Sequence, residues 1–205
     1  MAHSFHLITI IASAVLIPFQ KALVYEQDFK QGTHTDFAFT DESAWRVHDG
    51  SLELFAQSAY TPPYRSPFNI ALLRTKKVGS FTLEADVMQT GREYGHRDMC
   101  IFFGFQNTSQ FYYIHIASIP DEAAHNVFIV NNAPRTNFAH EVSDGIDWEG
   151  GWHKIRLERN IDTGLIRLYF DDMTVPIMEA RNTRFREGYI GFGSFDDTGK
   201  VDNIK

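Results

Sequence analysis

The sequence is almost free of cysteine, and Cys100 is the only one among its 205 residues. An intrachain disulfide is therefore excluded, and a domain of this size has to be stabilised by its apolar core. Because Cys100 lies in the apolar segment MCIFFGF, we interpret it as a small buried hydrophobic residue and not as a nucleophile.

Basic residues are also scarce. Lys and Arg number 19 against 26 Asp and Glu, which gives a formal net charge of −7 at pH 7. Nucleic acid binding requires a basic patch to face the phosphate backbone, so we expect no nucleic acid partner. No run of like charges indicates an acidic or basic tail.

Long apolar segments are missing, with one exception near the N-terminus. Residues 7–17 form an apolar run of eleven, which is too short to span a membrane and has the length of a signal-peptide core. We predict a signal peptide over residues 1–22, cleaved after Ala14 or Ala22, and a single domain over residues 23–205. A short uncleaved anchor is the alternative, because no Lys or Arg precedes the run. The mature chain is then a monomer without a membrane span, either secreted, periplasmic or extracellular.

No stretch shows the stripe of an amphipathic helix, whereas aromatic residues are abundant, with 18 Phe, 8 Tyr and 3 Trp. These types favour pleated, half-buried strands. A two-residue period is clear in GWHKIRLERN, GLIRLYFDD and FTLEADVM, as in strands with one face in a core. Asp49-Gly50 and residues 160–164 predict hairpin turns.

The same signals predict an all-β fold of two antiparallel sheets. Strands are expected at residues 24–28, 45–48, 51–55, 70–74, 81–88, 99–106, 111–117, 127–131, 153–159, 165–170, 177–180, 189–195 and 201–205. Asn107-Thr108 joins two of these segments and predicts that they pair as neighbours. A closed barrel is the alternative, but the irregular loop lengths favour a jelly roll.

The segments WRVHDGSLEL, FTLEADVM, GWHKIRLERN with GLIRLYFDD, and GYIGFGSFDDTGKVDNI follow one another in a familiar order. This order resembles the concanavalin-A-like jelly rolls, and among them the laminin-G-like and 3-keto-disaccharide-hydrolase branch, over residues 25–205. The resemblance implies two antiparallel sheets, one of them concave, with a glycan held in the concave groove. It implies no activity, because the fold carries lectins, hydrolases, lyases and adhesion modules. MCIFFGFQN stands where that branch has an asparagine-serine-glycine motif.

Two acidic residues, Glu84 and Asp86, share a strand face in LEADVMQ. The segment resembles the E-x-D-x-x-E strand of family 16 glycoside hydrolases, whose third acidic position corresponds here to Gln89. A retaining glycosidase needs two carboxyl groups about 5 Å apart, so the replacement breaks the required pair. We interpret Glu84 and Asp86 as part of a solvent-facing acidic strand.

The strongest candidate for a glycan site lies between residues 111 and 135. In SQFYYIHIAS, Phe111, Tyr113 and His115 share one strand face, and the opposite face is apolar. If residues 111–117 and 125–131 form a hairpin, several polar side chains converge on that face. The predicted ligand-binding residues are Arg65, Phe111, His125, Asn131, Arg135 and Trp148, with Arg65 and Trp148 at the rim.

The residue types in this set suit carbohydrate chemistry. Sugars stack on aromatic rings and form hydrogen bonds with Asn, Arg and His, so we predict a polysaccharide or oligosaccharide partner. A polysaccharide lyase uses the same types, with Arg neutralising a uronate carboxylate and His or Tyr moving a proton. His115 and Tyr113 are then the catalytic candidates. A glycan-cleaving enzyme, lyase or hydrolase, is the alternative to a binding domain, and an adhesion module is a third.

A metal is expected only through the resemblance. In related jelly rolls a structural calcium joins the first and last strands, which implies Asp202 as a side-chain ligand here. Asp28 or Glu26 and the Gly50 carbonyl are the implied partners, since calcium takes about six to eight oxygen ligands. No other cofactor is expected.

The remaining aspartates of the C-terminal segment GSFDDTGKVDNIK carry a simpler interpretation. Their spacing does not match an EF-hand loop. Asp197-Thr198-Gly199 predicts a turn, and we assign Asp196 and Asp197 to it. The scattered histidines and single cysteine give no zinc-site spacing.

Overall fold

The computed structural model describes residues 22–205, so the predicted signal peptide falls outside the described residues except for Ala22. One sheet has the order β1 (Phe37–Phe39), β4 (Asn69–Val78), β14 (Gly188–Ser194), β6 (Asp98–Asn107), β7 (Gln110–Ala117), β8 (Asn126–Asn131) and β9 (Thr136–Asn137). The other has the order β10 (Ala139–Val142), β13 (Met178–Arg181), β12 (Leu165–Phe170), β11 (His153–Arg159), β5 (Phe81–Gln89), β15 (Gly199–Asp202), β3 (Ser51–Leu54) and β2 (Trp45–His48). A 3-10 helix, η1 (Glu42–Ala44), precedes β2.

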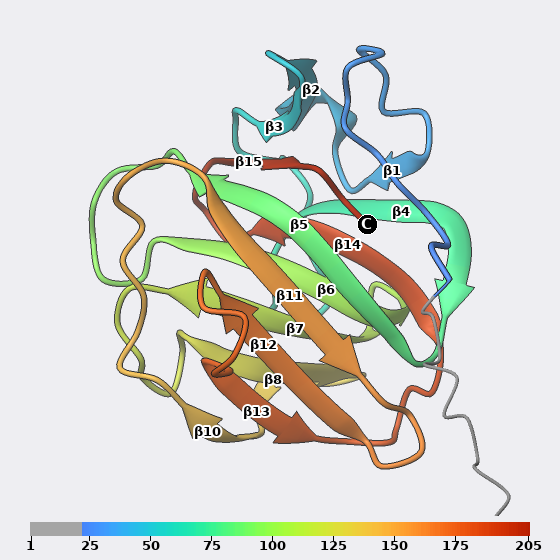
Figure 1. Ribbon diagram of the computed structural model, residues 1–205, viewed down its shortest axis with the longest axis vertical. Coiled ribbons are helices and arrows are strands. Elements are labelled where there is room, and N and C mark those ends of the chain that lie inside the picture. Colours follow the sequence, from blue (N-terminus) through green and yellow to red (C-terminus); the bar gives the residue numbers. More distant parts are fainter. Residues whose placement is uncertain (1–21) are drawn as a thin grey trace, which may run out of the picture.

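The two sheets are antiparallel and stack face to face, with β11 and β12 in front of β6 and β7 in Figure 1. The predicted all-β, two-sheet sandwich is therefore confirmed. Within the described part of the chain, no helix is long and apolar enough to cross a membrane.

The hairpins predicted from turn residues form as expected. Asp49 and Gly50 adopt positive φ angles of 50° and 68° between β2 and β3, the conformation that an Asp-Gly turn favours. β6 pairs with β7 across Asn107-Thr108, and β7 pairs with β8 with His115 opposite Asn126. The predicted hairpin of residues 111–131 is confirmed.

Differences from the predicted strands lie at the edges. Residues 24–28 form no extended strand and make a single bridge, from Gln27 to Ile204. The short strands β1, β9 and β10 were not predicted, because two to four residues are too few to show a period. Edge strands gain hydrogen bonds on one side only, so their sequences are weakly constrained.

The main core lies between the sheets. Tyr112, Ile114 and Ile116 of β7 are fully buried there, as their alternation predicted. The Tyr112 ring stacks on Phe103 with centroids 5.2 Å apart, and its hydroxyl accepts a hydrogen bond from the Phe185 amide at 3.1 Å. The ring of Tyr112 therefore packs against an aromatic neighbour, and its hydroxyl has a hydrogen-bond partner inside the sandwich.

A second apolar layer covers the outer face of the seven-stranded sheet. We call it the outer cluster, and its buried members are Ile70, Leu72, Cys100, Phe102, Phe105, Phe111, Tyr113, Phe128 and Val130. Tyr64, Tyr189 and Phe195 pack against it from loops and from β14. Cys100 is a free, fully buried thiol in this layer, which confirms its interpretation as a buried hydrophobic residue.

Phe103 tests how far the fold depends on the main core. Phe103→Ala removes a ring that is 0% exposed, so we expect the free energy of unfolding to fall by about 3–5 kcal/mol. Phe55→Ala is the control, because Phe55 is 42% exposed and its loss should change stability by less than about 1 kcal/mol. Urea unfolding followed by circular dichroism measures both. Equal losses in the two variants would contradict the assignment of Phe103 to the core.

Candidate functional site

Tyr113 lies on the outer face of the seven-stranded sheet, but it is covered. Its side chain is 0% exposed, and its ring stacks on Phe128 with centroids 5.0 Å apart and planes inclined by 9°. The hydroxyl accepts a hydrogen bond from Nη1 of Arg135 at 2.8 Å. Burial raises the pKa of Tyr113 well above its usual value, so the phenol stays protonated. Its role as a catalyst stays a prediction.

His115 is the neighbour of Tyr113 on the same face and is also buried. Its Nε2 lies 3.4 Å from Oδ2 of Asp98, and its Nδ1 accepts a hydrogen bond from the His125 amide at 3.3 Å. Burial, with a smaller contribution from the charge of Arg135, lowers the pKa of His115 to about 3. The imidazole is therefore neutral near pH 7 and is occupied by contacts within the protein.

Asp98 anchors a buried polar group around this histidine. Its Oδ1 accepts a hydrogen bond from Ser194 at 2.5 Å, and its Oδ2 accepts one from the Cys100 thiol at 2.9 Å. Burial raises the pKa of Asp98 to about 8, against the hydrogen bonds from Cys100 and Ser194 that lower it. The group ties β6 to β7 and β14 at one end of the sheet.

His125, the other histidine of the predicted set, directly precedes β8 and has a positive φ of 48°. The side chain is fully buried; its Nδ1 accepts the Ala117 amide at 3.3 Å, and its Nε2 lies 3.0 Å from Oγ of Ser143. Burial lowers the pKa of His125 to about 4. Its contacts connect β7 to the segment after β10.

Arg135 and Arg65 lie where loops cross the outer cluster. The guanidinium of Arg135 is 4.7 Å from the centroid of Phe128 and 4.4 Å from that of Phe195, so it caps both rings. The Arg135 amide donates a hydrogen bond to the Arg65 carbonyl at 3.2 Å, and the Arg65 side chain is exposed. Together the two loops cover the face that we expected to be an open groove.

The other predicted ligand residues are dispersed. Phe111 is fully buried and stacks on Phe105 with centroids 4.9 Å apart. Asn131 is half-buried at the end of β8, beside Arg184. Trp148 lies in the core between the sheets, where its Nε1 donates to the Arg97 carbonyl at 3.2 Å, and not at the predicted rim. Trp148 was expected at the rim of the groove, but the loop that carries it turns inward and buries its indole ring between the sheets.

The open part of the outer face lies at the β6–β7 turn, at the end of β6 that is opposite to Asp98. A hollow of about 450 Å³ is bordered by the rings of Tyr60, Phe105 and Tyr189, with Arg74 and Asn107 at its side. The Arg74 guanidinium lies 4.6 Å from the Tyr189 centroid. The sequence analysis did not identify Tyr60 and Tyr189, which are both half-buried. Tyr60 stands just before the Pro62-Pro63 turn signal, and Tyr189 begins a predicted strand, so their positions could have marked them as candidates.

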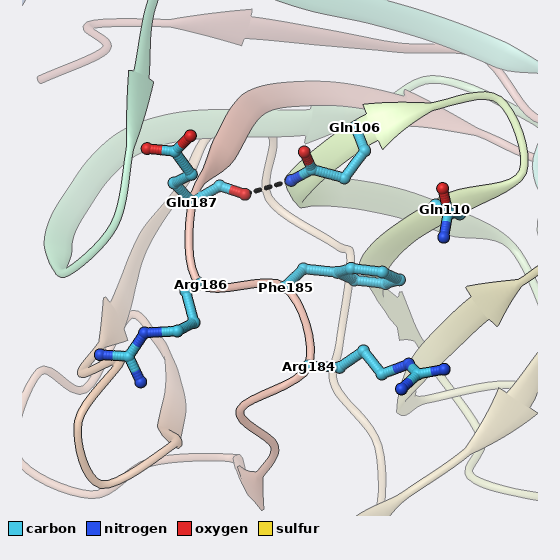
Figure 2. A pocket seen from close by; sticks show the side chains of 6 residues that line it. All are labelled: Gln106, Gln110, Arg184, Phe185, Arg186 and Glu187. Atoms are coloured by element: carbon cyan, nitrogen blue, oxygen red, sulfur yellow. Dashed lines mark hydrogen bonds between the residues drawn. The ribbon is translucent and has the colours of Figure 1, made fainter.

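A second hollow of about 490 Å³ adjoins the first, because Gln106 lines both. Its floor is the loop that precedes β14, and Figure 2 shows Arg184 and Arg186 extending from this loop in opposite directions. Gln106 Nε2 donates hydrogen bonds to the carbonyls of Gly104, at 3.1 Å, and of Glu187 (Figure 2). The two hollows form a polar and aromatic depression around the β6–β7 turn.

The acidic strand lies on the outer face of the other sheet. Asp86 is paired with Lys154 at 3.1 Å and accepts a hydrogen bond from Asn203 at 2.8 Å. Gln89 points to the opposite face of β5 and is buried, so it does not share a site with Glu84 and Asp86.

The residues implied as calcium ligands are only partly brought together. Asp202 has a buried Oδ1 without a hydrogen-bond partner among residues 22–205. Burial, followed by the charges of Asp86 and Asp28, raises the pKa of Asp202. Asp28 accepts a hydrogen bond from Lys30 Nζ at 2.8 Å, and Gly50 lies in the β2–β3 turn. The orphaned carboxylate oxygen fits a cation, and calcium at Asp202, Asp28 and Gly50 stays a prediction.

The buried state of His125 predicts a pH dependence of stability. Its pKa falls from 6.5 to about 4 on folding, so the unfolded chain binds the extra proton in this interval. Stability is therefore lost as the pH falls from about 6.5 to about 4. Between pH 7 and pH 4.5 the wild type should lose roughly 2 kcal/mol more than His125→Gln, which cannot titrate. Asp98 and His115 titrate in both proteins, so urea unfolding at the two pH values isolates His125; parallel losses would contradict its neutral buried state.

No protein-family model matches the sequence, and no curated protein matches it either. Solved structures do match. The carbohydrate-binding module CBM66 from Bacillus subtilis superposes with a TM-score of 0.61 at 17% identity, over 82% of this chain and 93% of that one. A lectin from Bauhinia forficata in complex with GalNAc gives a TM-score of 0.56 at 10% identity, over 88% and 95% of the two chains.

The GH43 protein BlXynB from Bacillus licheniformis gives a TM-score of 0.57 at 12% identity, over 88% of this chain and 38% of that one. These identities are too low to carry an activity from one protein to another, and what they share with this chain is the arrangement of strands. The chain thus has the concanavalin-A-like jelly-roll fold.

Proposed function

We propose that this domain binds a carbohydrate on the outer face of its seven-stranded sheet. The observation that carries the proposal is the depression bordered by Tyr60, Phe105 and Tyr189. Its volume of about 450 Å³ is in the range of small-ligand sites, and its lining combines aromatic rings with a few polar groups. The names of the structural neighbours, a carbohydrate-binding module and a lectin, support the same function.

The chemistry of the lining suits a sugar. The apolar face of a pyranose ring stacks on tyrosine, while its hydroxyls need donors and acceptors at the edge. Arg74 and Asn107 supply such groups beside the rings, and Gln106 leads into the adjoining hollow with Arg184. An oligosaccharide of more than one unit would extend from the aromatic part into this second part.

Export is part of the proposal. It rests on the apolar run at residues 7–17, and an exported glycan-binding domain would meet its polysaccharide outside the cell. Expression with the native N-terminus, followed by mass measurement of the protein in the periplasm or medium, tests export. Retention of the full-length chain in the cytoplasm would contradict it.

Tyr60 and Tyr189 test the glycan site. Tyr60→Ala or Tyr189→Ala removes a stacking surface. We therefore expect the affinity for whichever polysaccharide the wild type binds to fall about tenfold or more, which equals about 1.4 kcal/mol. Trp152→Ala is the matched control, because Trp152 is an exposed aromatic residue outside the depression, at 43% exposure. Affinity electrophoresis against a panel of neutral and acidic polysaccharides, followed by calorimetry, gives the constants. Binding to no member of the panel, or an equal loss in Trp152→Ala, would refute the proposal.

The same panel tests cleavage by His115 and Tyr113. Both side chains are buried and satisfied, so we expect no unsaturated uronate product from the wild type. Ultraviolet absorbance of the product is the measurement. Product that disappears in a folded His115→Gln variant would instead establish a lyase.

A further inference from the structure

One end of the sandwich brings together three chain segments that the proposed glycan site does not use. They are the end of β5 at Gln89, the start of β6 at Asp98, and residues 194–198 after β14. Hydrogen bonds tie them, from the Asp98 amide to Asp197 Oδ2 at 2.9 Å and from the Thr90 amide to the Thr198 carbonyl at 2.9 Å. The two sheets are joined at this point by polar contacts.

Three carboxylates gather there, and we call Asp98, Asp196 and Asp197 the acidic end cluster. One oxygen of each lies within 4.8 Å of the others. Calcium–oxygen distances are about 2.3–2.6 Å, so oxygens on opposite sides of one calcium ion are about 4.8 Å apart. Asp98 is fully buried and Asp197 is 4% exposed, whereas Asp196 is exposed and opens the cluster to solvent.

A buried amide points into the same space. Gln89 is 8% exposed, and neither its Nε2 nor its Oε1 has a hydrogen-bond partner in the described chain. A Cβ on Gly91 would lie 2.7 Å from Asp197 Oδ1 and 2.8 Å from Gln89 Nε2, so the carboxylate and the amide face one space that glycine leaves open. A half-turn of the amide places Oε1 there and breaks no hydrogen bond.

Asp196 and Asp197 are not balanced by basic side chains, and burial raises the pKa of Asp98 and so favours its protonated form, which would give up its proton when a cation binds. Among the ion pairs of residues 22–205, none joins Asp196 or Asp197 to a lysine or arginine, and Asp98 meets only His115 at 3.4 Å. Asp197 Oδ2 is held by the Tyr94 hydroxyl at 2.8 Å, a neutral donor. Close carboxylates without a counter-charge, next to an unpartnered buried amide, are the environment that a bound cation would complete.

We propose that the acidic end cluster, together with the Gln89 amide oxygen, binds one calcium ion. Carboxylate and amide oxygens are hard ligands, and a site that supplies four protein oxygens suits calcium better than magnesium, which keeps most of its water. The ion would join β5 of one sheet to β6 and β14 of the other. This site is distinct from the one implied at Asp202 and Asp28.

The neighbouring set of Asp98, Cys100 and His115 is the competing metal site at this end. Its ligand atoms also lie within 4.8 Å of one another, and its chemistry would suit zinc. The three atoms already contact one another, with Sγ 2.9 Å and Nε2 3.4 Å from the same Asp98 oxygen. Asp98 belongs to both sets, so the difference lies in the other members. Cys100 and His115 already have partners, whereas Gln89 has none in the described chain, and the geometry favours the oxygen site.

Calcium binding is measured on the whole chain after treatment with EDTA. We expect calorimetry to give a calcium site that raises the melting temperature, and Tb³⁺ bound there to luminesce through Tyr94. Asp196→Asn should weaken calcium binding about tenfold or more. It should not lower the melting temperature in EDTA, because no hydrogen bond or ion pair of the described chain uses this exposed side chain and its charge only repels Asp197.

Two further variants separate the outcomes. Gln89→Met replaces the orphaned amide by an apolar side chain of similar shape, so it should raise the melting temperature in EDTA and reduce the gain on adding calcium. Asp202→Asn is the matched control and should leave the acidic-cluster site intact. The proposal is overturned if calcium does not raise the melting temperature of the wild type, or if Asp196→Asn and Gln89→Met keep the full increase. It is also overturned if Asp202→Asn alone removes the increase, or if zinc binds in place of calcium.

Discussion

The central strands β6, β7 and β8 of the seven-stranded sheet are largely buried on both faces, and the positions of the other functional features depend on this. Tyr112 and Tyr113 are neighbours in β7, yet both are fully buried, one between the sheets and one in the outer cluster. Single jelly-roll sheets commonly leave one face to solvent, which is where a ligand can lie. Here the loop that carries Tyr64 and the Arg135 guanidinium cover much of that face.

Burial on both faces determines the protonation of the polar groups that remain inside. His115 and His125 are neutral because an imidazolium would lose its hydration, and every ring nitrogen contact that they make is internal. A titratable group held in this way stabilises one arrangement of strands. Both sites that we propose therefore lie at the ends of the sheet, one at the β6–β7 turn and one at the acidic end cluster, which reaches solvent through Asp196.

The strands with a strong two-residue period could be predicted from the sequence, and so could the hairpins at Asp49-Gly50 and Asn107-Thr108. These signals are local, since alternation and turn conformation depend on residues a few positions apart. The edge strands β1, β9 and β10 could not, because they are short and are held by one neighbour each. The alternation of β7 correctly placed His115 and Tyr113 on one face, but it could not show that the loops with Tyr64 and Arg135 cover that face.

What the sequence determined by itself is the all-β class, the separation of Tyr112 from Tyr113 and His115 onto opposite faces, and the buried nature of Cys100. Each follows from the period of a strand or from local composition. Only the tertiary structure decided which face is open, because its cover comes from Tyr64, Arg135 and Phe195, far apart in the chain. Long-range strand pairing, and not local sequence, also brings Gln89 beside the segment that carries Asp197 and ties Asp197 to Asp98.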